Sequence, residues 1–321
     1  MILVTGATGF VGSHLVEKLR SHGEAVRCLV RPGTDARRLP PGVETAAGSL
    51  DTGEGMAGAL QGVDVVIHAA GVTKAFSEAG YFAGNAHATG TLARAMAGRS
   101  IRLVYVSSLA AIGPSLDGQP LAEDADPHPV SAYGRSKLAG ERIVRAAVPD
   151  AVIIRPPVVY GPRDTGVFQI LKAVAQGWVV EIAGGERWFS AIYVEDLAEG
   201  LCAASRAPGI AGRAYFLAHR KPATWQELGN TAAQIMGRHP RTVRVPVAVA
   251  NAVAWVSEMW SQVSRNPAII SREKVAEACW RFWTCEPAKA ASDLGFEAPT
   301  PLAAGLAKTL TWYKEAGWLK Y

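Results

Sequence analysis

Short apolar runs alternate with amphipathic stretches over the first 160 residues. Runs of strand length stand at residues 2–4, 25–30, 63–70, 101–108 and 151–157. The run VDVVIHAA at 63–70 is apolar nearly throughout, as in strands that are buried on both faces of a parallel sheet. Val11, Leu15 and Leu19 repeat at helical spacing, and residues 132–147 also have the pattern of a helix. This alternation predicts an α/β fold with a doubly wound parallel sheet.

The pattern changes after residue 160. Strand-like runs become sparse, and helical periodicity predicts helices at 167–176, 195–206, 224–236, 247–263 and 300–316. The run AIYV at 191–194 is expected to return to the region of the sheet. We therefore expect two domains. One comprises residues 1–160, with 187–216 returning to it, and the other is a smaller, mostly helical domain over 161–321.

A glycine-rich turn, TGATGFVG at 5–12, follows the first predicted strand and opens the first predicted helix. Gly6 would permit a tight turn, Gly9 would let the backbone approach a pyrophosphate, and Gly12 would let helix and strand pack closely. The helix N-terminus would add unpaired amides and the positive end of its dipole. The motif therefore predicts that residues 1–160 form a dinucleotide-binding Rossmann domain.

The end of the second predicted strand bears on the choice of cofactor. An acidic residue there would hydrogen-bond the adenosine ribose of NAD, but this strand ends at Val30 and Arg31. A guanidinium can pair with a 2′-phosphate, and Arg37 or Arg38 would be near enough to help. NADP(H) is therefore favoured over NAD(H), with the alternative that Arg31 is simply exposed at a strand end.

Seven segments, in this order, resemble the short-chain dehydrogenase/reductase superfamily. They are TGATGFVG (5–12), IHAAG (67–71), VYVSS (104–108), YGRSK (133–137), RPPVVYGPRD (155–164), IYVEDLAEGL (192–201) and EPAKAASDLGF (286–296). The closer likeness is to its extended branch, the NAD-dependent epimerase/dehydratase family. The C-terminal half looks more like the 3β-hydroxysteroid dehydrogenase and dihydroflavonol reductase-like branch.

The resemblance implies a catalytic set of Ser108, Tyr133, Lys137 and Asn85. Tyr133 would be the acid/base, because hydride transfer at an alcohol carbon requires a proton to move to or from the oxygen. A free tyrosine has a pKa of about 10, and a lysine one helical turn away, together with the positive charge of the nicotinamide, would favour the tyrosinate and lower that pKa. Ser108 would orient the substrate oxygen.

The resemblance also implies a set of cofactor contacts, with Pro157 and Val158 lying under the nicotinamide carboxamide. The full set is Gly6, Thr8, Gly9, Phe10, Val11, Gly12, Arg31, Ala69, Ala70, Gly71, Tyr133, Lys137, Pro156, Pro157 and Val158.

Several positions depart from the patterns of enzymes that act on sugar nucleotides. Leu109 and Ala110 stand where the dehydratases of the family carry acidic residues, and Val158 stands where the 4-epimerases commonly have asparagine. Phe189 replaces an arginine that clamps substrate phosphates, although Arg187 is two residues away. The predicted function is therefore a nicotinamide-dependent oxidoreductase that interconverts a secondary alcohol and a ketone, with an apolar substrate as one option. The alternative is an epimerase of a nucleotide- or lipid-linked sugar that retains NAD.

The segment PVAVANAVAWVSEMW at 246–260 is apolar on several faces and shorter than the roughly 20 residues of a membrane span. It could pack into the core or a dimer contact, form a lid over an apolar substrate, or touch a membrane surface.

Composition and charge indicate which kinds of partner the protein is expected to bind. The net charge is +5, but the basic residues are scattered, which argues against nucleic-acid binding. Four cysteines without a C-x-x-C pair or a histidine cluster predict reduced thiols and no metal. No signal-peptide pattern opens the chain, so we expect a cytoplasmic protein, and the resemblance implies a homodimer that acts on a small molecule.

Three further polar residues lie in or near these motifs. His68 and Asp196 are expected to be structural, Asp196 as a residue at a helix N-terminus. Lys74 lies near the position of a lysine that touches the cofactor in epimerases, and its role stays open.

Overall fold

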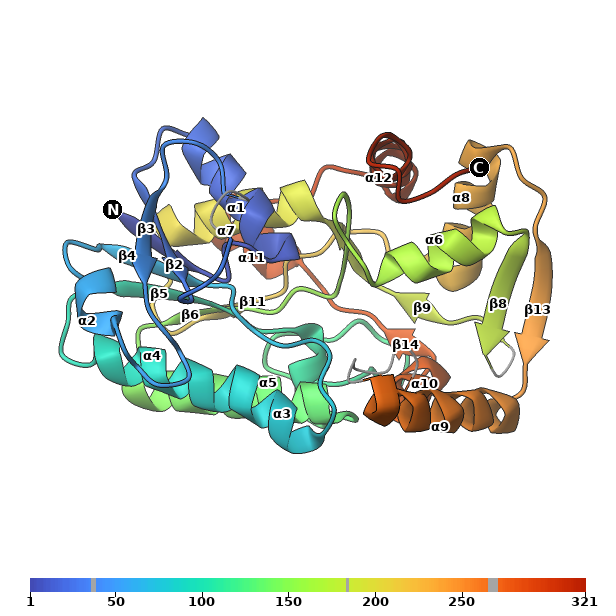
Figure 1. Ribbon diagram of the computed structural model, residues 1–321, viewed down its shortest axis with the longest axis horizontal. Helices are drawn as coiled ribbons and strands as arrows, with labels where there is room; N and C mark the ends of the chain where they lie inside the picture. The colour runs from blue at the N-terminus through green and yellow to red at the C-terminus, as the bar shows by residue number, and fades with distance from the viewer. Residues whose placement is uncertain (36–38, 183–184, 265–270) are drawn as a thin grey trace.

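The computed structural model describes residues 1–35, 39–182, 185–264 and 271–321 (Figure 1). Arg37 and Arg38, which were expected to assist Arg31, lie outside the described residues.

A seven-stranded parallel sheet dominates the N-terminal half, in the order β11-β6-β5-β4-β1-β2-β3. Its strands are β1 (Ile2–Thr5), β2 (Val26–Val30), β3 (Glu44–Ala47), β4 (Val65–His68), β5 (Arg102–Val106), β6 (Val152–Ile154) and β11 (Ala214–Tyr215). The predicted doubly wound sheet is confirmed. The strand order reverses between β1 and β4, and ligands of such sheets bind beyond the carboxyl ends of the strands at that point.

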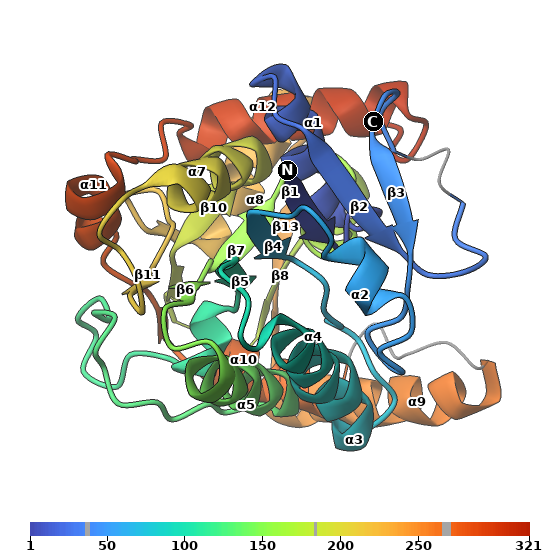
Figure 2. The same cartoon turned by 90° about the vertical axis from the view of Figure 1, so that its left-hand side faces the viewer.

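Helices cover both faces of the sheet (Figure 2). On one face lie α1 (Phe10–Ser21) and α7 (Val194–Arg206), and on the other lie α2 (Met56–Ala59), α3 (Glu78–Phe82), η2 (Ala83–His87), α4 (Ala88–Met96) and α5 (Ala132–Ala147). Strand residues alternate between the two cores: Val4 packs with Leu15 under α1, whereas Leu3 packs with Leu92 and Val144 under α4 and α5.

The C-terminal half holds α6 (Val167–Ala175), α8 (Trp225–Met236), α9 (Val247–Ser264), α10 (Arg272–Cys279), α11 (Ala288–Leu294) and α12 (Leu302–Glu315). Small sheets accompany these helices. They are β7 (Val158–Tyr160) with β10 (Ala191–Tyr193), β8 (Trp178–Ile182) with β13 (Arg241–Val245), and β9 (Trp188–Phe189) between β12 (Ala223–Thr224) and β14 (Phe282–Trp283).

The five helices predicted after residue 160 are confirmed within a few residues, whereas two strand pairings of this half were not predicted. Residues 191–194 do not join the large sheet, because β10 pairs with β7 in a sheet of its own, and β11 takes the edge position instead. The parallel pair of β8 and β13 was not foreseen, since its two strands are about 60 residues apart in the chain and their partner cannot be read from local pattern.

Candidate active site

The glycine-rich turn is built so that only glycine fits at two of its positions. Gly6 has φ +73°, and a Cβ there would lie 2.6 Å from the amide nitrogen of Ala70. A Cβ on Gly12 would collide with the carbonyl oxygen of Gly6. The amide of Gly9 donates to that same carbonyl at 2.9 Å and closes the turn. The close approach expected of Gly6 and Gly12 is therefore present.

The N-terminus of α1 offers the features of an anion site. Gly9 is the N-cap, has no side chain to cap the helix, and no acidic residue stands in the first turn. The first amides of the helix are then available to a phosphate, together with the positive end of the helix dipole. This open cradle fits the pyrophosphate of a dinucleotide. Thr8 lies in the turn, and Phe10 and Val11 begin the helix.

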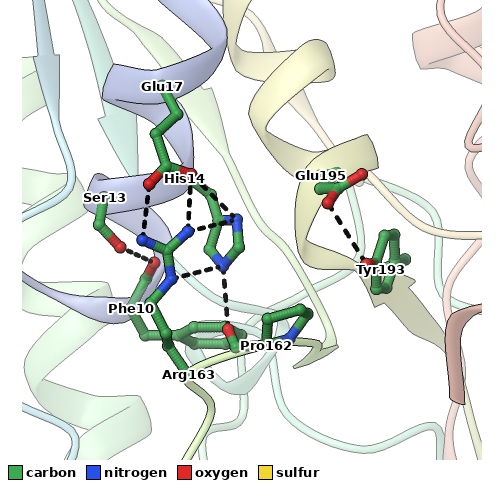
Figure 3. Close-up of polar contacts among 8 residues, drawn as sticks. All are labelled: Phe10, Ser13, His14, Glu17, Pro162, Arg163, Tyr193 and Glu195. Carbon is green, nitrogen blue, oxygen red and sulfur yellow. Dashed lines mark hydrogen bonds and ion pairs between the residues drawn. The ribbon is translucent and has the colours of Figure 1, made fainter. Parts of the chain in front are cut away.

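Arg163 connects this helix to the loop that follows β7 (Figure 3). Its guanidinium forms two hydrogen bonds of 2.7 Å with the carboxylate of Glu17 and also contacts both ring nitrogens of His14, at 3.2 and 3.0 Å. His14 Nε2 lies 2.9 Å from the carbonyl oxygen of Pro162. Arg163 has φ +73°, a backbone conformation that L-residues rarely adopt. The contacts with Glu17 and His14 hold the residue in this strained conformation.

Ser108 and Tyr133 meet at the carboxyl ends of the strands. Ser108 caps η3 (Leu109–Ala111), with its Oγ accepting from the amide of Ala110 at 3.1 Å. Burial raises the pKa of Tyr133 to about 12, while a hydrogen bond with Ser108 acts to lower it. In the chain alone, desolvation outweighs this contact and keeps the phenol protonated; the lowering expected with the nicotinamide bound stays a prediction.

Lys137 lies one turn after Tyr133 on α5 and is buried. Its ammonium donates to the carbonyl of Val106 at 2.6 Å and stands 4.8 Å from the centroid of the Tyr105 ring. Burial lowers the pKa of Lys137 to about 8, and the charge of Glu141 acts to raise it. A lysine in this setting can change its charge close to neutral pH.

Asn85 belongs to the short π-helix η2 between α3 and α4. Its Oδ1 accepts from the amide of Val72 at 2.7 Å, and its Nδ2 donates to the Val72 carbonyl and to Ser136 Oγ, both at 2.9 Å. Both amide hydrogens are thereby used. Asn85 holds the 71–72 segment against α5, and π-turns of this kind recur at functional sites.

The segment 69–71 runs from the glycine turn to Lys137. The amides of Ala69 and Ala70 donate to the carbonyl and the hydroxyl of Thr5, at 3.2 and 3.3 Å. A Cβ on Gly71 would lie 2.9 Å from Asn85 Oδ1 and 3.7 Å from Lys137 Nζ. A side chain at position 71 would therefore press on Asn85 and extend toward the ammonium of Lys137.

The segment 156–158 is attached to the same region. The Pro156 carbonyl accepts from the amide of Leu109 at 2.9 Å, which ties the Ser108 turn to the end of β6. Pro157 follows directly, and Val158 begins β7, where its amide donates to the Ser190 carbonyl at 3.3 Å. Arg31 is exposed at the end of β2, directly after Val30.

Two residues beside Tyr133 were missed by sequence reasoning. The ring of Tyr81 packs edge-on against that of Tyr133, with 6.1 Å between centroids. Glu277 of α10 acts on Tyr133 through its charge and hydrogen-bonds Ser131; burial raises the pKa of the Glu277 carboxyl. Neither residue lies in a motif, and α10 reaches α5 across about 140 residues of chain, as the Glu273 bond to the amide of Ala132 shows.

A cleft of about 270 Å³ opens beside these tyrosines. It is lined by residues from 75–81 and from the α9–α10 region: Ala75, Phe76, Ser77, Glu78, Tyr81, Glu258, Ser261, Ser271, Arg272, Glu273 and Lys274. Neither this cleft nor a larger hollow of about 500 Å³ near Glu195 and Lys308 is lined by a predicted site residue. The cleft is connected to the site through Tyr81, which lines it and whose ring packs against that of Tyr133.

Comparison with known proteins identifies the chain. Residues 2–218 match the model of the NAD dependent epimerase/dehydratase family. The chain belongs to this family. It is an enzyme of the extended short-chain dehydrogenase/reductase type, as its resemblance predicted.

Two curated relatives of this epimerase/dehydratase family member carry names of reductases. The chain is 34% identical over 322 residues to the ceramide reductase of Caulobacter vibrioides, covering 99% of this chain and 96% of the relative. It is 30% identical over 283 residues to the 4-hydroxy-2-methyl-3-oxo-4-farnesyl-3,4-dihydroquinoline-1-oxide ketoreductase of Stigmatella aurantiaca, covering 83% of each. A solved structure of MoeE5 with UDP-glucose and NAD has a TM-score of 0.78 and 25% identity, over 98% of this chain and 99% of that one.

The residues that were compared by resemblance with sugar-nucleotide contacts make apolar contacts in this chain. Phe189 is buried and stacks on Trp225, with 4.1 Å between ring centroids. Leu109 is buried as well. Arg187, considered as a replacement for the phosphate-clamping arginine, donates to the carbonyl of Gly185 at 3.1 Å.

The remaining polar residues behave largely as predicted. His68 lies 2.6 Å from Thr5 Oγ1 and 3.0 Å from Thr89 Oγ1, and burial lowers its pKa to about 3, so it is a neutral structural residue. Asp196 stands in the first turn of α7 and accepts from the amide and the hydroxyl of Thr300, at 2.9 and 2.8 Å. The charge of Lys74 acts on Asp164 and on Lys274.

Over the described ranges, no group of three His, Cys, Asp or Glu side chains is placed to hold a metal ion, and no helix is long and apolar enough to cross a membrane. All four cysteines are free thiols.

Proposed function

We propose that this protein is an NADP(H)-dependent reductase that converts a ketone on an apolar, lipid-like substrate into a secondary alcohol. The observation that supports it most directly is the 2.6 Å hydrogen bond that fixes Lys137 to the end of β5, one helical turn after Tyr133 and two residues before Ser108. A phenol whose pKa is about 12 is suited to give a proton to an alkoxide rather than to accept one at neutral pH.

The proposed catalytic residues have separate roles. The cofactor, when bound, supplies the hydride that reduces the carbonyl carbon. Tyr133 donates its phenolic proton to the carbonyl oxygen, and Ser108 hydrogen-bonds the same oxygen and orients it. Lys137, when charged, stabilises the tyrosinate that remains. Asn85 is a positioning residue, because its amide holds Val72 and Ser136.

The cofactor would be held by residues of the N-terminal half. The glycine turn and the first amides of α1 would take the pyrophosphate, and Arg31 would pair with the 2′-phosphate of NADP(H). The segments 69–71 and 156–158 would border the nicotinamide end. In this proposal residues 1–160 bind the cofactor, residues 161–321 bind the substrate, and the enzyme acts as a cytoplasmic homodimer.

The apolar substrate is supported by the site and by the relatives. Val158, Leu109 and Phe189 remove the polar contacts that a sugar diphosphate would use. The two curated relatives are named for reactions on ceramide and on a farnesyl compound, both of which carry long hydrocarbon chains. A ketone flanked by such chains is the substrate class that this site fits.

The test begins with the cofactor that the purified protein carries. The protein is denatured, and any released nucleotide is identified by mass. An empty site, or one that exchanges NADP, supports a reductase; stoichiometric NAD would overturn the proposal and favour the epimerase alternative. Oxidation of NADPH with an N-acylated long-chain amino ketone is then measured. No turnover with it, alongside turnover of a UDP-sugar, would also defeat the proposal.

A further inference from the structure

The outward side of α9 is apolar, which is the reverse of the usual arrangement for a surface helix. Val249, Val253, Val256 and Trp260 recur at helical spacing and are 50%, 50%, 58% and 69% exposed. Met259 and Trp255 add to the same side and are also exposed. We call these six side chains the α9 face.

The helix is held to the protein by its opposite side. Ala250 and Ala254 are buried in a small cluster with Val275 of α10, and Ile182 and Val245 pack against this cluster. In both Figures 1 and 2, α9 lies at the margin of the molecule with the protein on one side of it. Of the alternatives left open for this segment, packing into the core does not hold for the α9 face.

The α9 face carries no charge. By sequence, Glu258 is the one charged residue between 247 and 264. Its carboxylate accepts from the amide and from Nε of Arg272, both at 2.8 Å, and it is thereby held toward α10. Uncharged apolar patches of this kind mark surfaces that contact another apolar phase or partner.

The charges around the face indicate which partner it meets. From residue 238 to 274 the sequence contains six basic residues (Arg238, Arg241, Arg244, Arg265, Arg272 and Lys274) and two acidic ones (Glu258 and Glu273). Arg244 pairs with Glu181 and Arg272 with Glu258, whereas Arg238 and Arg241 are exposed on the segment that leads through β13 into α9. An apolar helix face with tryptophans and basic flanks matches the interface of an anionic lipid membrane.

We propose that the α9 face docks the protein on the surface of an anionic membrane, with α9 lying in the plane of the interface. Glu258 and Ser261 of the same helix line the cleft beside Tyr81, across from Phe76, which is itself exposed. Docking would therefore bring the mouth of the cleft to the membrane, where a lipid ketone could enter. This last step rests on the proposed function, whereas the docking does not.

The test is flotation of the whole protein with vesicles of phosphatidylglycerol and phosphatidylcholine, and with phosphatidylcholine alone. The wild type should float with the anionic vesicles, and less at high salt. Val256→Glu combined with Trp260→Glu should reduce the bound fraction about tenfold. Ile235→Glu is the matched control, because Ile235 is an exposed apolar residue on α8, on the opposite margin of the molecule in Figure 1.

Three outcomes would overturn the docking proposal. The first is a wild type that does not float with anionic vesicles, and the second is a double variant that floats as well as the control. The third is a double variant that is monomeric where the wild type is dimeric, with no form binding vesicles, which would make the α9 face a contact between copies. Reduction of a water-soluble ketone is followed in parallel. A double variant that no longer floats but still reduces the water-soluble ketone is folded, and this result supports docking through the α9 face.

Discussion

The ammonium of Lys137 donates a hydrogen bond to the carbonyl oxygen of Val106, with 2.6 Å between Nζ and O. Val106 is the last residue of β5, and Ser108 follows two positions later. The lysine is therefore tied to the strand that carries Ser108, while its own helix carries Tyr133. This hydrogen bond thus connects α5 to β5, whose relative position sets how the Ser108 hydroxyl lies beside the Tyr133 phenol.

Replacing the proton donor should abolish the reaction and leave the cofactor site intact. Tyr133→Phe is expected to lower kcat about 100- to 10,000-fold, since it removes the acid. Cofactor affinity, measured by fluorescence titration, should change little. Tyr81→Phe keeps the ring contact with Tyr133 and serves as the control, with activity near that of the wild type. Comparable activity in both variants would contradict the assigned role.

The buried lysine should give reduction a pH dependence. The pKa of Lys137 is lowered to about 8 by burial, so its ammonium is charged below that pH and neutral above it. If the charge stabilises the tyrosinate, kcat/KM for reduction should fall as the pH rises through about 8. Lys137→Met should be slower and lack this inflection. An inflection that persists in Lys137→Met would belong to another group.

The protonation of Lys137 should also make the free energy of unfolding depend on pH. Its pKa is lowered in the folded state, so between about 8 and the unfolded value the unfolded chain binds more protons. The free energy of unfolding of the wild type should therefore gain a contribution as the pH rises through that window. Urea titrations at several pH values measure it. Lys137→Met should lose this gain, and an identical slope in both proteins would argue against a depressed pKa.

Arg31 should control the choice between the two nicotinamide cofactors. Removing one charge-assisted contact with a phosphate costs about 1.5–3 kcal/mol, so Arg31→Asp should raise the KM for NADPH roughly ten- to hundredfold. The KM for NADH should fall, because aspartate can accept from the ribose hydroxyls. Arg31→Lys keeps the charge and should lie between these proteins. Unchanged Michaelis constants for both cofactors would show that Arg31 is merely exposed.

The glycine turn should not tolerate a methyl group at its third glycine. Gly12→Ala places a Cβ against the Gly6 carbonyl, which should cost about 1–3 kcal/mol of stability and weaken cofactor binding. Gly58→Ala is the control: a Cβ on this helical glycine meets nothing within 4 Å, and stability should stay equal or rise by about 0.4–1 kcal/mol. Thermal unfolding of both variants measures the difference, and equal effects would refute the packing argument.

The buried pair of Glu141 and Arg155 should be a large contributor to the stability of α5. Two hydrogen bonds of 3.0 and 2.7 Å join them, and Ser107 donates to the same carboxylate at 2.6 Å. Glu141→Ala would leave a buried guanidinium unpaired, at a cost of about 3–5 kcal/mol in urea unfolding. The exposed pair of Arg220 and Glu297 offers the comparison, since Glu297→Ala should cost about 0–1 kcal/mol. Similar losses in both would contradict the effect of burial.

The sequence predicted the features whose cause is local. The glycine turn, the helix at 132–147 and the buried strands follow from backbone conformation and from side-chain period, which neighbouring residues set among themselves. Strand β3, with the sequence ETAA, was missed because its residues are largely exposed at the sheet edge and lack an apolar pattern. Tyr81 and Glu277 were missed because nothing near them in the chain marks them.

What the sequence by itself determined is the family, the doubly wound sheet and the positions of Ser108, Tyr133 and Lys137 along the chain. The tertiary structure alone decided that α10 would reach Tyr133, that Phe189 would stack on Trp225, and that the apolar side of α9 would face outward. It also raised the pKa of Tyr133, because a pKa depends on how completely distant segments exclude water. Contacts between segments that are far apart in the chain leave no periodic pattern in the sequence. They can therefore be recognised only in the folded structure.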